Sequence, residues 1–189
     1  MDDVGAVLGP GEEGLLRPSG RYERVRFERL ALMEASLRDA EFLSCTFVGC
    51  DLTLAGMDGA VVRDVRFEAC RLLGVHLGAW RRDALGTEAT FAGCDLDRTQ
   101  AIRMDLRACR FEGGRIRRAE FSGCDLRGVT FEGTDLHGTR FDGSDLRRAD
   151  LRSARGYRID PRTVRVEGLR ASVPEAASFL EMLGIDLAG

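Results

Sequence analysis

The chain of 189 residues carries 28 basic and 31 acidic side chains, a net charge of −3, and its apolar content of 44% suffices for one domain with a continuous core. A near-neutral chain argues against direct binding to nucleic acid, because contacts with phosphates need an excess of positive charge. We also find no apolar run long enough to span a membrane.

The N-terminal segment, residues 1–19, is acidic and rich in glycine. It lacks the positively charged start and the following apolar run that are typical of a signal peptide. We therefore expect a cytoplasmic protein. The first 19 residues are predicted to form a flexible segment or a cap on the domain that follows.

A period of five residues dominates the chain after this segment. One frame runs from Tyr22 to Leu77 and a second from Phe91 to Leu151, with a large apolar residue at almost every fifth position. Nine of the ten phenylalanines occupy these central positions. Small residues predominate two positions earlier, and glycine recurs two positions later, where it suits a turn. This period fits neither a helix nor an ordinary strand and indicates a repeat protein.

Segments such as CDLRG (124–128), TDLHG (134–138) and SDLRR (144–148) resemble the units of pentapeptide-repeat proteins. The resemblance covers residues 20–155 and implies an all-β solenoid, a right-handed quadrilateral β-helix with four units in each coil. The central and small residues then point inward, and phenylalanines twenty positions apart stack in columns. About six coils at the ordinary strand spacing would form a rod. The four prolines lie outside the repeats, as intact hydrogen-bond ladders require.

All six cysteines occupy the small inward position of a unit, where a thiol packs as a modest hydrophobe. Cys50 and Cys70 are one coil apart, which a disulfide tolerates. A cytoplasmic setting argues against such a bond. No pair has the CxxC spacing of a zinc site, so the sequence predicts neither a metal nor another cofactor.

The period is interrupted by residues 78–90, where either four residues have been inserted or one has been lost. Excursions from a rigid solenoid often carry binding residues, and Trp and Arg are favoured interface anchors. The candidate contact residues are Trp80, Arg81, Arg82 and Asp83. In the alternative interpretation, the only tryptophan folds back as a plug over the mismatched coil.

Charge is organised in columns on the second half of the predicted rod. We expect an acidic ladder of Asp105, Asp125 and Asp145, beside a basic ladder of Arg107, Arg127 and Arg147. Neighbouring ladders of opposite sign largely neutralise each other, so a solvated face of mixed charge is the simpler interpretation. The first half instead has apolar outward positions. If these fall on one or two adjacent faces, they predict a docking patch. They are Leu43, Val48, Leu54, Val61 and Leu73.

The period decays after residue 155, and we expect residues 156–171 to form an irregular final coil. Residues 172–189 then change to a helical period. Ser172 and Glu175 fit a capping box, and Gly184 fits a glycine stop. Such a short helix is marginal alone, so its apolar face must cap the last coil, join two chains in a homodimer, or do both. The residues of this face are Ala176, Phe179, Leu180 and Leu183.

The C-terminal sequence VPEAASFLEMLGIDLAG resembles the gyrase-protecting branch of pentapeptide-repeat proteins, which includes Qnr, MfpA and the albicidin and microcin immunity proteins. The resemblance implies end-to-end dimers that bind DNA gyrase, and sometimes topoisomerase IV, and that relieve topoisomerase poisons, giving antibiotic resistance or self-immunity. A negatively charged rod that acts as a DNA mimic is one mechanism suggested for that branch. The near-neutral charge of this chain departs from it.

No catalytic residues are predicted. The two histidines, His76 and His137, lie far apart at outward positions, and no nucleophile, base and orienting group emerge together. The alternative to a topoisomerase-binding protein is therefore a non-enzymatic scaffold that binds an unrelated protein partner.

Overall fold

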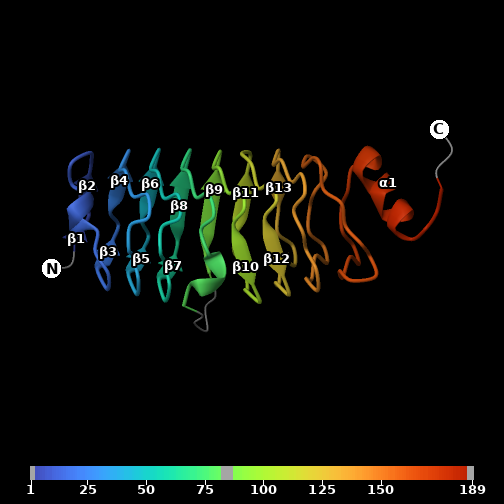
Figure 1. Cartoon of the computed structure of the whole chain (residues 1–189), viewed down its shortest axis with the longest axis horizontal. Helices are drawn as coiled ribbons and strands as arrows, with labels where there is room; N and C mark the ends of the chain where they lie inside the picture. The colour runs from blue at the N-terminus through green and yellow to red at the C-terminus, as the bar shows by residue number, and fades with distance from the viewer. Residues whose placement is uncertain (1–2, 82–86, 187–189) are drawn as a thin grey trace.

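The protein is a β-solenoid closed at its C-terminal end by one short helix (Figure 1). This computed structural model describes residues 3–81 and 87–186. The strands are β1 (Asp3–Val4), β2 (Val7–Leu8), β3 (Arg21–Glu23), β4 (Arg26–Glu28), β5 (Glu41–Leu43), β6 (Thr46–Val48), β7 (Val61–Arg63), β8 (Val65–Glu68), β9 (Ala89–Ala92), β10 (Gln100–Ile102), β11 (Arg110–Glu112), β12 (Glu120–Ser122) and β13 (Phe131–Glu132). The helices are the 3-10 turns η1 (Glu13–Leu15) and η2 (Leu77–Ala79) and the α-helix α1 (Val173–Met182).

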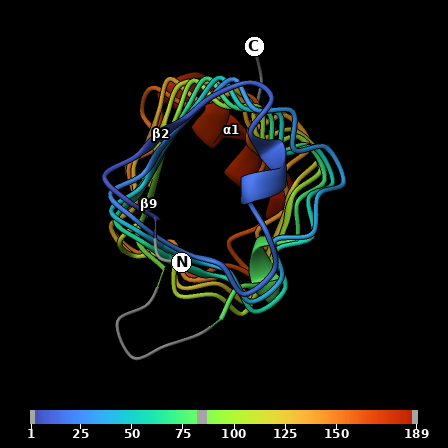
Figure 2. The same ribbon diagram turned by 90° about the vertical axis from the view of Figure 1, so that its left-hand side faces the viewer.

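The strands pair only in parallel, which confirms the solenoid predicted from the five-residue period. The longest sheet contains seven strands in the order β13-β11-β9-β8-β6-β4-β2. Each strand is only two to four residues long, because the chain turns after every repeat unit. In each unit, the central residue and the small residue two positions before it point inward. Figure 2 views the stacked coils along the solenoid axis and shows α1 across the far end.

Stacked phenylalanines form the centre of the core. Phe27 pairs in register with Phe47, and Phe47 with Phe67, so equivalent residues are twenty positions apart. The ring centroids of Phe27 and Phe47 lie 4.3 Å apart, and those of Phe91 and Phe111 lie 5.3 Å apart, both pairs stacked. Burial of these rings supplies much of the apolar driving force for coil-on-coil packing.

The pairing of residues between adjacent coils shows whether residues were inserted or lost in segment 78–90. The amide of Arg81 donates to the carbonyl of Ala60, which keeps the twenty-residue spacing. Phe67, however, pairs with Phe91, twenty-four residues later. Four residues have therefore been inserted after Arg81, and the alternative of one lost residue is excluded. The stack of phenylalanines continues across the insertion without a break.

The N-terminal segment, expected to be flexible or a cap, forms an additional coil in its described part. β1 pairs with β3, and β2 pairs with β4, each in parallel. Tyr22 closes this coil, because its hydroxyl donates to the carbonyl of Leu15 and accepts from the amide of Arg17, at 2.9 and 3.0 Å. β1 and β2 are therefore the edge strands of their sheets at this end of the solenoid.

The six cysteines are buried and free, which agrees with the packing role predicted for them. Cys50, Cys70 and Cys94 follow one another along one inward column, and each thiol reaches a carbonyl of the preceding coil. Burial raises the pKa of Cys109 to about 12, so this thiol stays protonated at neutral pH.

The C-terminal coil is more regular than expected, since Asp145 pairs with Arg165 and Asp150 with Arg170. Helix α1 follows, and its start differs from the predicted capping box. Ser172 is the N-cap but makes no side-chain capping bond. Glu175 accepts a hydrogen bond from the amide of Gly156 instead, at 2.9 Å, because docking on the last coil brings that donor within reach.

The predicted glycine stop of α1 is confirmed. Gly184 has φ +80°, and its amide donates to the carbonyl of Glu181. The amide of Ile185 reaches back to the carbonyl of Leu180. These two bonds form a Schellman motif, which satisfies the last carbonyls of the helix.

Candidate functional site

The candidate contact residues around the insertion do not share one environment. Trp80 is buried, with 3% of its surface exposed, and packs in the core. This agrees with the plug interpretation, so the ring offers no surface to a partner in this conformation. Its indole N–H has no hydrogen-bond partner among the described residues. Arg81 is half exposed and pairs with Glu41 at 2.7 Å. Arg82 and Asp83 lie outside the described residues.

The acidic ladder exists as predicted in its geometry. Asp105 and Asp125 pair across adjacent coils, as do Asp125 and Asp145. Each aspartate is bound by the arginine two positions later, for example Asp125 by Arg127 at 2.7 Å. These ion pairs remove the acidic character of the face, as the sequence predicted for two adjacent ladders.

Asp145 is the most strongly bound member of the ladder. Hydrogen bonds from the Arg147 guanidinium lower the pKa of this carboxyl to about 2. Arg165 approaches the same carboxylate at 3.7 Å. Since the pKa in the unfolded chain is about 3.9, the ionised Asp145 stabilises the fold above about pH 4. That contribution is lost as the pH falls towards 2.

Asp145→Asn is therefore expected to lower the free energy of unfolding at pH 7 by about 1–2 kcal/mol, because a charged hydrogen-bonded pair is replaced by a weaker one. The difference from the unmodified protein should shrink as the pH falls from 4 to about 2, where the native carboxyl is itself protonated. Urea unfolding at several pH values measures this. Asp105→Asn is the matched control, since Asp105 is more exposed and should cost less. A difference that does not vary with pH would contradict the assignment.

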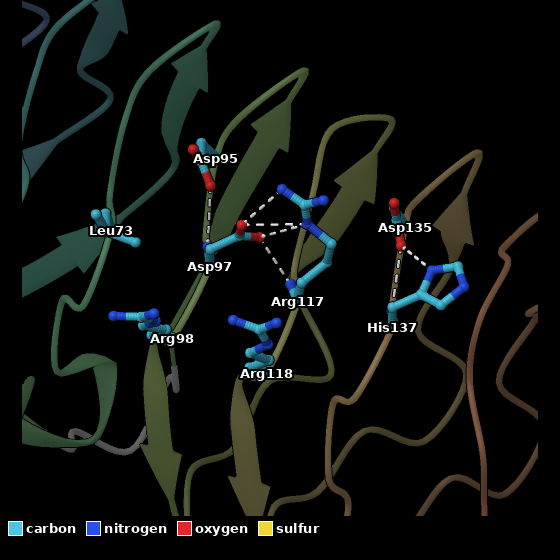
Figure 3. Close-up of a pocket in the computed structure, with 8 residues that line it drawn as sticks. All are labelled: Leu73, Asp95, Asp97, Arg98, Arg117, Arg118, Asp135 and His137. Atoms are coloured by element: carbon cyan, nitrogen blue, oxygen red, sulfur yellow. Dashed lines mark hydrogen bonds and ion pairs between the residues drawn. The ribbon is translucent and has the colours of Figure 1, made fainter.

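A groove of about 670 Å³, half a coil away from the acidic ladder, was not predicted from the sequence (Figure 3). Its three carboxylates are all paired. Asp97 accepts from Arg117 at 3.0 Å, and Asp135 contacts Nδ1 of His137 at 2.6 Å. Asp95 pairs with the Arg115 guanidinium.

Two arginines of this groove stand apart from these pairs. Arg98 and Arg118 are exposed, and neither guanidinium has an acidic partner among the described residues. Both have positive φ values, 61° and 54°, at the turn position where ten other units have glycine. Arginine at a position otherwise favourable to glycine is the sequence signal that could have identified them.

The outward apolar residues of the first half do not form one patch. Leu43 and Val61 belong to β5 and β7, whereas Val48 belongs to β6 on a different sheet. Val61 is buried. Leu54 and Leu73 lie on the face that contains the groove, and Leu54 is 55% exposed. The predicted patch is thus wrong as a whole, and only its part on the groove face remains.

The apolar face of α1 is divided between two environments. Phe179 packs on the solenoid, where its ring centroid lies 6.2 Å from that of Tyr157. Ala176 is half-buried. Leu180 and Leu183 remain 40% and 50% exposed. Part of the predicted face therefore caps the last coil, and the rest faces solvent.

Neither a metal site nor a membrane span emerges from the described residues. No cluster of three or more His, Cys, Asp or Glu side chains suited to a metal ion occurs within residues 3–81 and 87–186. In the same part of the chain, no helix has the length and apolarity needed to cross a bilayer.

Comparison with protein families identifies the repeat. Residues 87–123 and 115–152 match the model of pentapeptide repeats, with eight copies. Residues 87–152 are pentapeptide repeats. No curated protein matched the sequence.

One solved structure supports the same fold along the whole chain. A trypsin-treated variant of QnrB1, described as a plasmid-mediated fluoroquinolone resistance protein, superposes with a TM-score of 0.65. It is 17% identical, and the match covers 100% of this chain and 98% of that chain. HetL from the cyanobacterium Nostoc sp. strain PCC 7120, a pentapeptide-repeat protein involved in heterocyst differentiation regulation, is 18% identical. Its TM-score is 0.45, with coverage of 92% of this chain and 85% of that chain.

Proposed function

We propose that this protein binds DNA gyrase as a homodimer and protects the enzyme from topoisomerase poisons in the cytoplasm. The observation that carries the proposal is the match along nearly the whole of both chains to QnrB1, a protein named for fluoroquinolone resistance. The proposed role needs no catalytic group. The protein must bind the drug-free enzyme more tightly than the poisoned complex, because a partner with equal affinity for both does not change the equilibrium between them.

Two features of this chain support such a role. Leu180 and Leu183 expose apolar surface at one end of the rod, as a dimer interface on α1 requires. The four-residue insertion after Arg81 interrupts an otherwise regular surface, where a rigid scaffold can carry specific contacts. Arg81, Arg82 and Asp83 are the proposed contact residues there, while Trp80 supports them from the core.

The charge distribution favours specific contacts over simple mimicry of DNA. Asp105, Asp125 and Asp145 are each neutralised by an arginine of the adjacent ladder. A negatively charged rod is therefore not what this face presents, and direct binding to nucleic acid is not part of the proposal.

A supercoiling and cleavage assay with purified gyrase tests the proposal. The protein is titrated against a fluoroquinolone and an albicidin-like compound, and the same series with topoisomerase IV identifies the preferred enzyme. We expect supercoiling to recover and the cleaved complex to decrease, at protein concentrations that leave gyrase alone uninhibited. No recovery with any poison, using a folded dimer and gyrase from a matched host, would refute the function.

A shortened variant tests the contact segment. Removal of residues 82–85 restores the twenty-residue spacing, so the coils should still stack. We expect this variant to fold and to lose protection. Full protection by the folded variant would exclude the insertion as the contact site.

The second candidate function is a scaffold for an unrelated protein. The exposed apolar side chains of Met33 and Leu54 on consecutive coils favour it, because such residues on a soluble surface often mark a docking site. This function predicts no effect in the supercoiling assay.

A further inference from the structure

The face that contains the groove changes character along the rod. Ala31, Asp51, Arg71, Asp95 and Arg115 pair in succession, so these coils are in register on this face. Met33 and Leu54 follow Ala31 and Asp51 closely in the sequence and so lie beside this column on two neighbouring coils. Their exposed fractions are 58% and 55%. The next coil contributes Leu73, which lines the groove. Exposed apolar surface therefore leads directly into the groove.

Three arginines and three aspartates line the groove, and its charge becomes positive when Arg115 and Arg155, which pair with two of these aspartates, are included. Asp95, Asp97 and Asp135 are all bound to arginine or histidine side chains. Arg98 and Arg118 are left with no acidic partner in the described part of the chain. Figure 3 shows Leu73, Arg98 and Arg118 in sequence on successive turns of the solenoid. The face thus presents leucine first and then two free cations.

From this arrangement we infer that the groove face is a docking surface for an extended, acidic segment of a partner protein. An apolar side chain of that segment lies on Leu54 and Leu73, and two carboxylates bind Arg98 and Arg118. Guanidinium groups bind carboxylates well because they donate hydrogen bonds in a planar fork. Peptides commonly bind grooves through a small number of such anchors.

The dimensions agree with a short extended segment that follows the rod axis. Three coil steps separate Leu54 from Arg118, or about 14 Å at the usual spacing between strands. An extended chain rises about 3.3 Å per residue, so about four residues span this distance. The segment therefore needs an apolar residue and an acidic pair within one short stretch.

Nucleic acid fits the surface less well. A phosphate backbone would pair with Arg98 and Arg118, but it has no apolar group to place on Leu54 and Leu73. These leucines would therefore gain nothing from a phosphate chain. The acidic ladder lies on another face of the rod. The inference does not depend on the proposed binding to a topoisomerase.

Selection from a displayed library of random peptides on the intact protein tests the inference. We expect enrichment of peptides with acidic residues close to a Leu, Ile or Phe residue. The variant Arg98→Glu/Arg118→Glu should bind the enriched peptides at least about tenfold more weakly, because it replaces two attractions with repulsions. Leu54→Ser should weaken the same peptides without changing their dependence on salt. Fluorescence anisotropy with synthetic copies of the peptides measures each affinity.

The matched control is Arg29→Glu/Arg103→Glu. Both residues are exposed arginines with positive φ and no acidic partner in the described residues, but they lie outside the groove. This control should retain full affinity, and circular dichroism should show an intact fold for every variant. Equal losses of peptide affinity in the control and groove variants would overturn the inference. A selection that does not enrich acidic peptides would overturn it as well. Binding of a duplex DNA probe that depends on Arg98 and Arg118, without peptide binding, would overturn it in favour of nucleic acid.

Discussion

Gly114→Ala is expected to destabilise the protein by about 3 kcal/mol or more, the sum of backbone strain and overpacking. Gly114 occupies an inward position with φ +75°, which L-amino acids with a side chain rarely adopt. An added Cβ would also meet the backbone of Cys94 in the preceding coil, 2.7 Å from its amide nitrogen. Backbone atoms cannot move aside without separating the two coils.

The neighbouring glycine is a matched control for this variant. Gly113 has nearly the same φ, +70°, but a Cβ there would meet no atom within 4 Å. Gly113→Ala should cost only the strain of the left-handed conformation, about 1 kcal/mol. Urea unfolding followed by the fluorescence of the single buried tryptophan, Trp80, measures both variants. Equal costs for the two would show that contact with the preceding coil is unimportant.

Leu180→Glu/Leu183→Glu is expected to convert the proposed dimer to a monomer. Two buried, unpaired carboxylates at the interface should weaken dimerisation at least about a hundredfold. The fold should survive, because Phe179 and Glu175 attach α1 to the last coil through contacts that do not involve either leucine. Light scattering coupled to size-exclusion chromatography measures the mass over a range of concentrations.

The opposite end of the rod offers the control for dimerisation. Leu15 in the N-terminal coil is 48% exposed, close to the 50% of Leu183. Leu15→Glu should leave the mass unchanged. A monomeric unmodified protein at every concentration would contradict the dimer and would leave α1 only as a cap.

Much of the fold could be predicted because the five-residue period records which side chains point inward. Phe27, Phe47 and Phe67 had to stack once the coil length was known, and they do. The ion pairs between Asp125 and Arg127 were likewise predictable, since both positions repeat with the coil. Local spacing is enough wherever every coil repeats the same geometry.

Other features depended on contacts between coils, which cannot be predicted from the spacing of residues within one repeat. Glu175 suited a capping box, but the free amide of Gly156 on the last coil competed for it. Trp80 suited an interface, yet the coil beneath it buried the ring. The importance of Arg98 and Arg118 became visible only when the other charges of the groove were found to be paired.

The sequence by itself determined the repeat, its inward residues, the columns of charge and the position of the terminal helix, because each follows from spacing along the chain. The tertiary structure alone decided that four residues are inserted after Arg81, which side of α1 remains exposed, and which arginines lack a partner. These features depend on which coil lies against which. Free energy from burial and pairing is shared between residues twenty or more positions apart, and no short stretch of sequence specifies it.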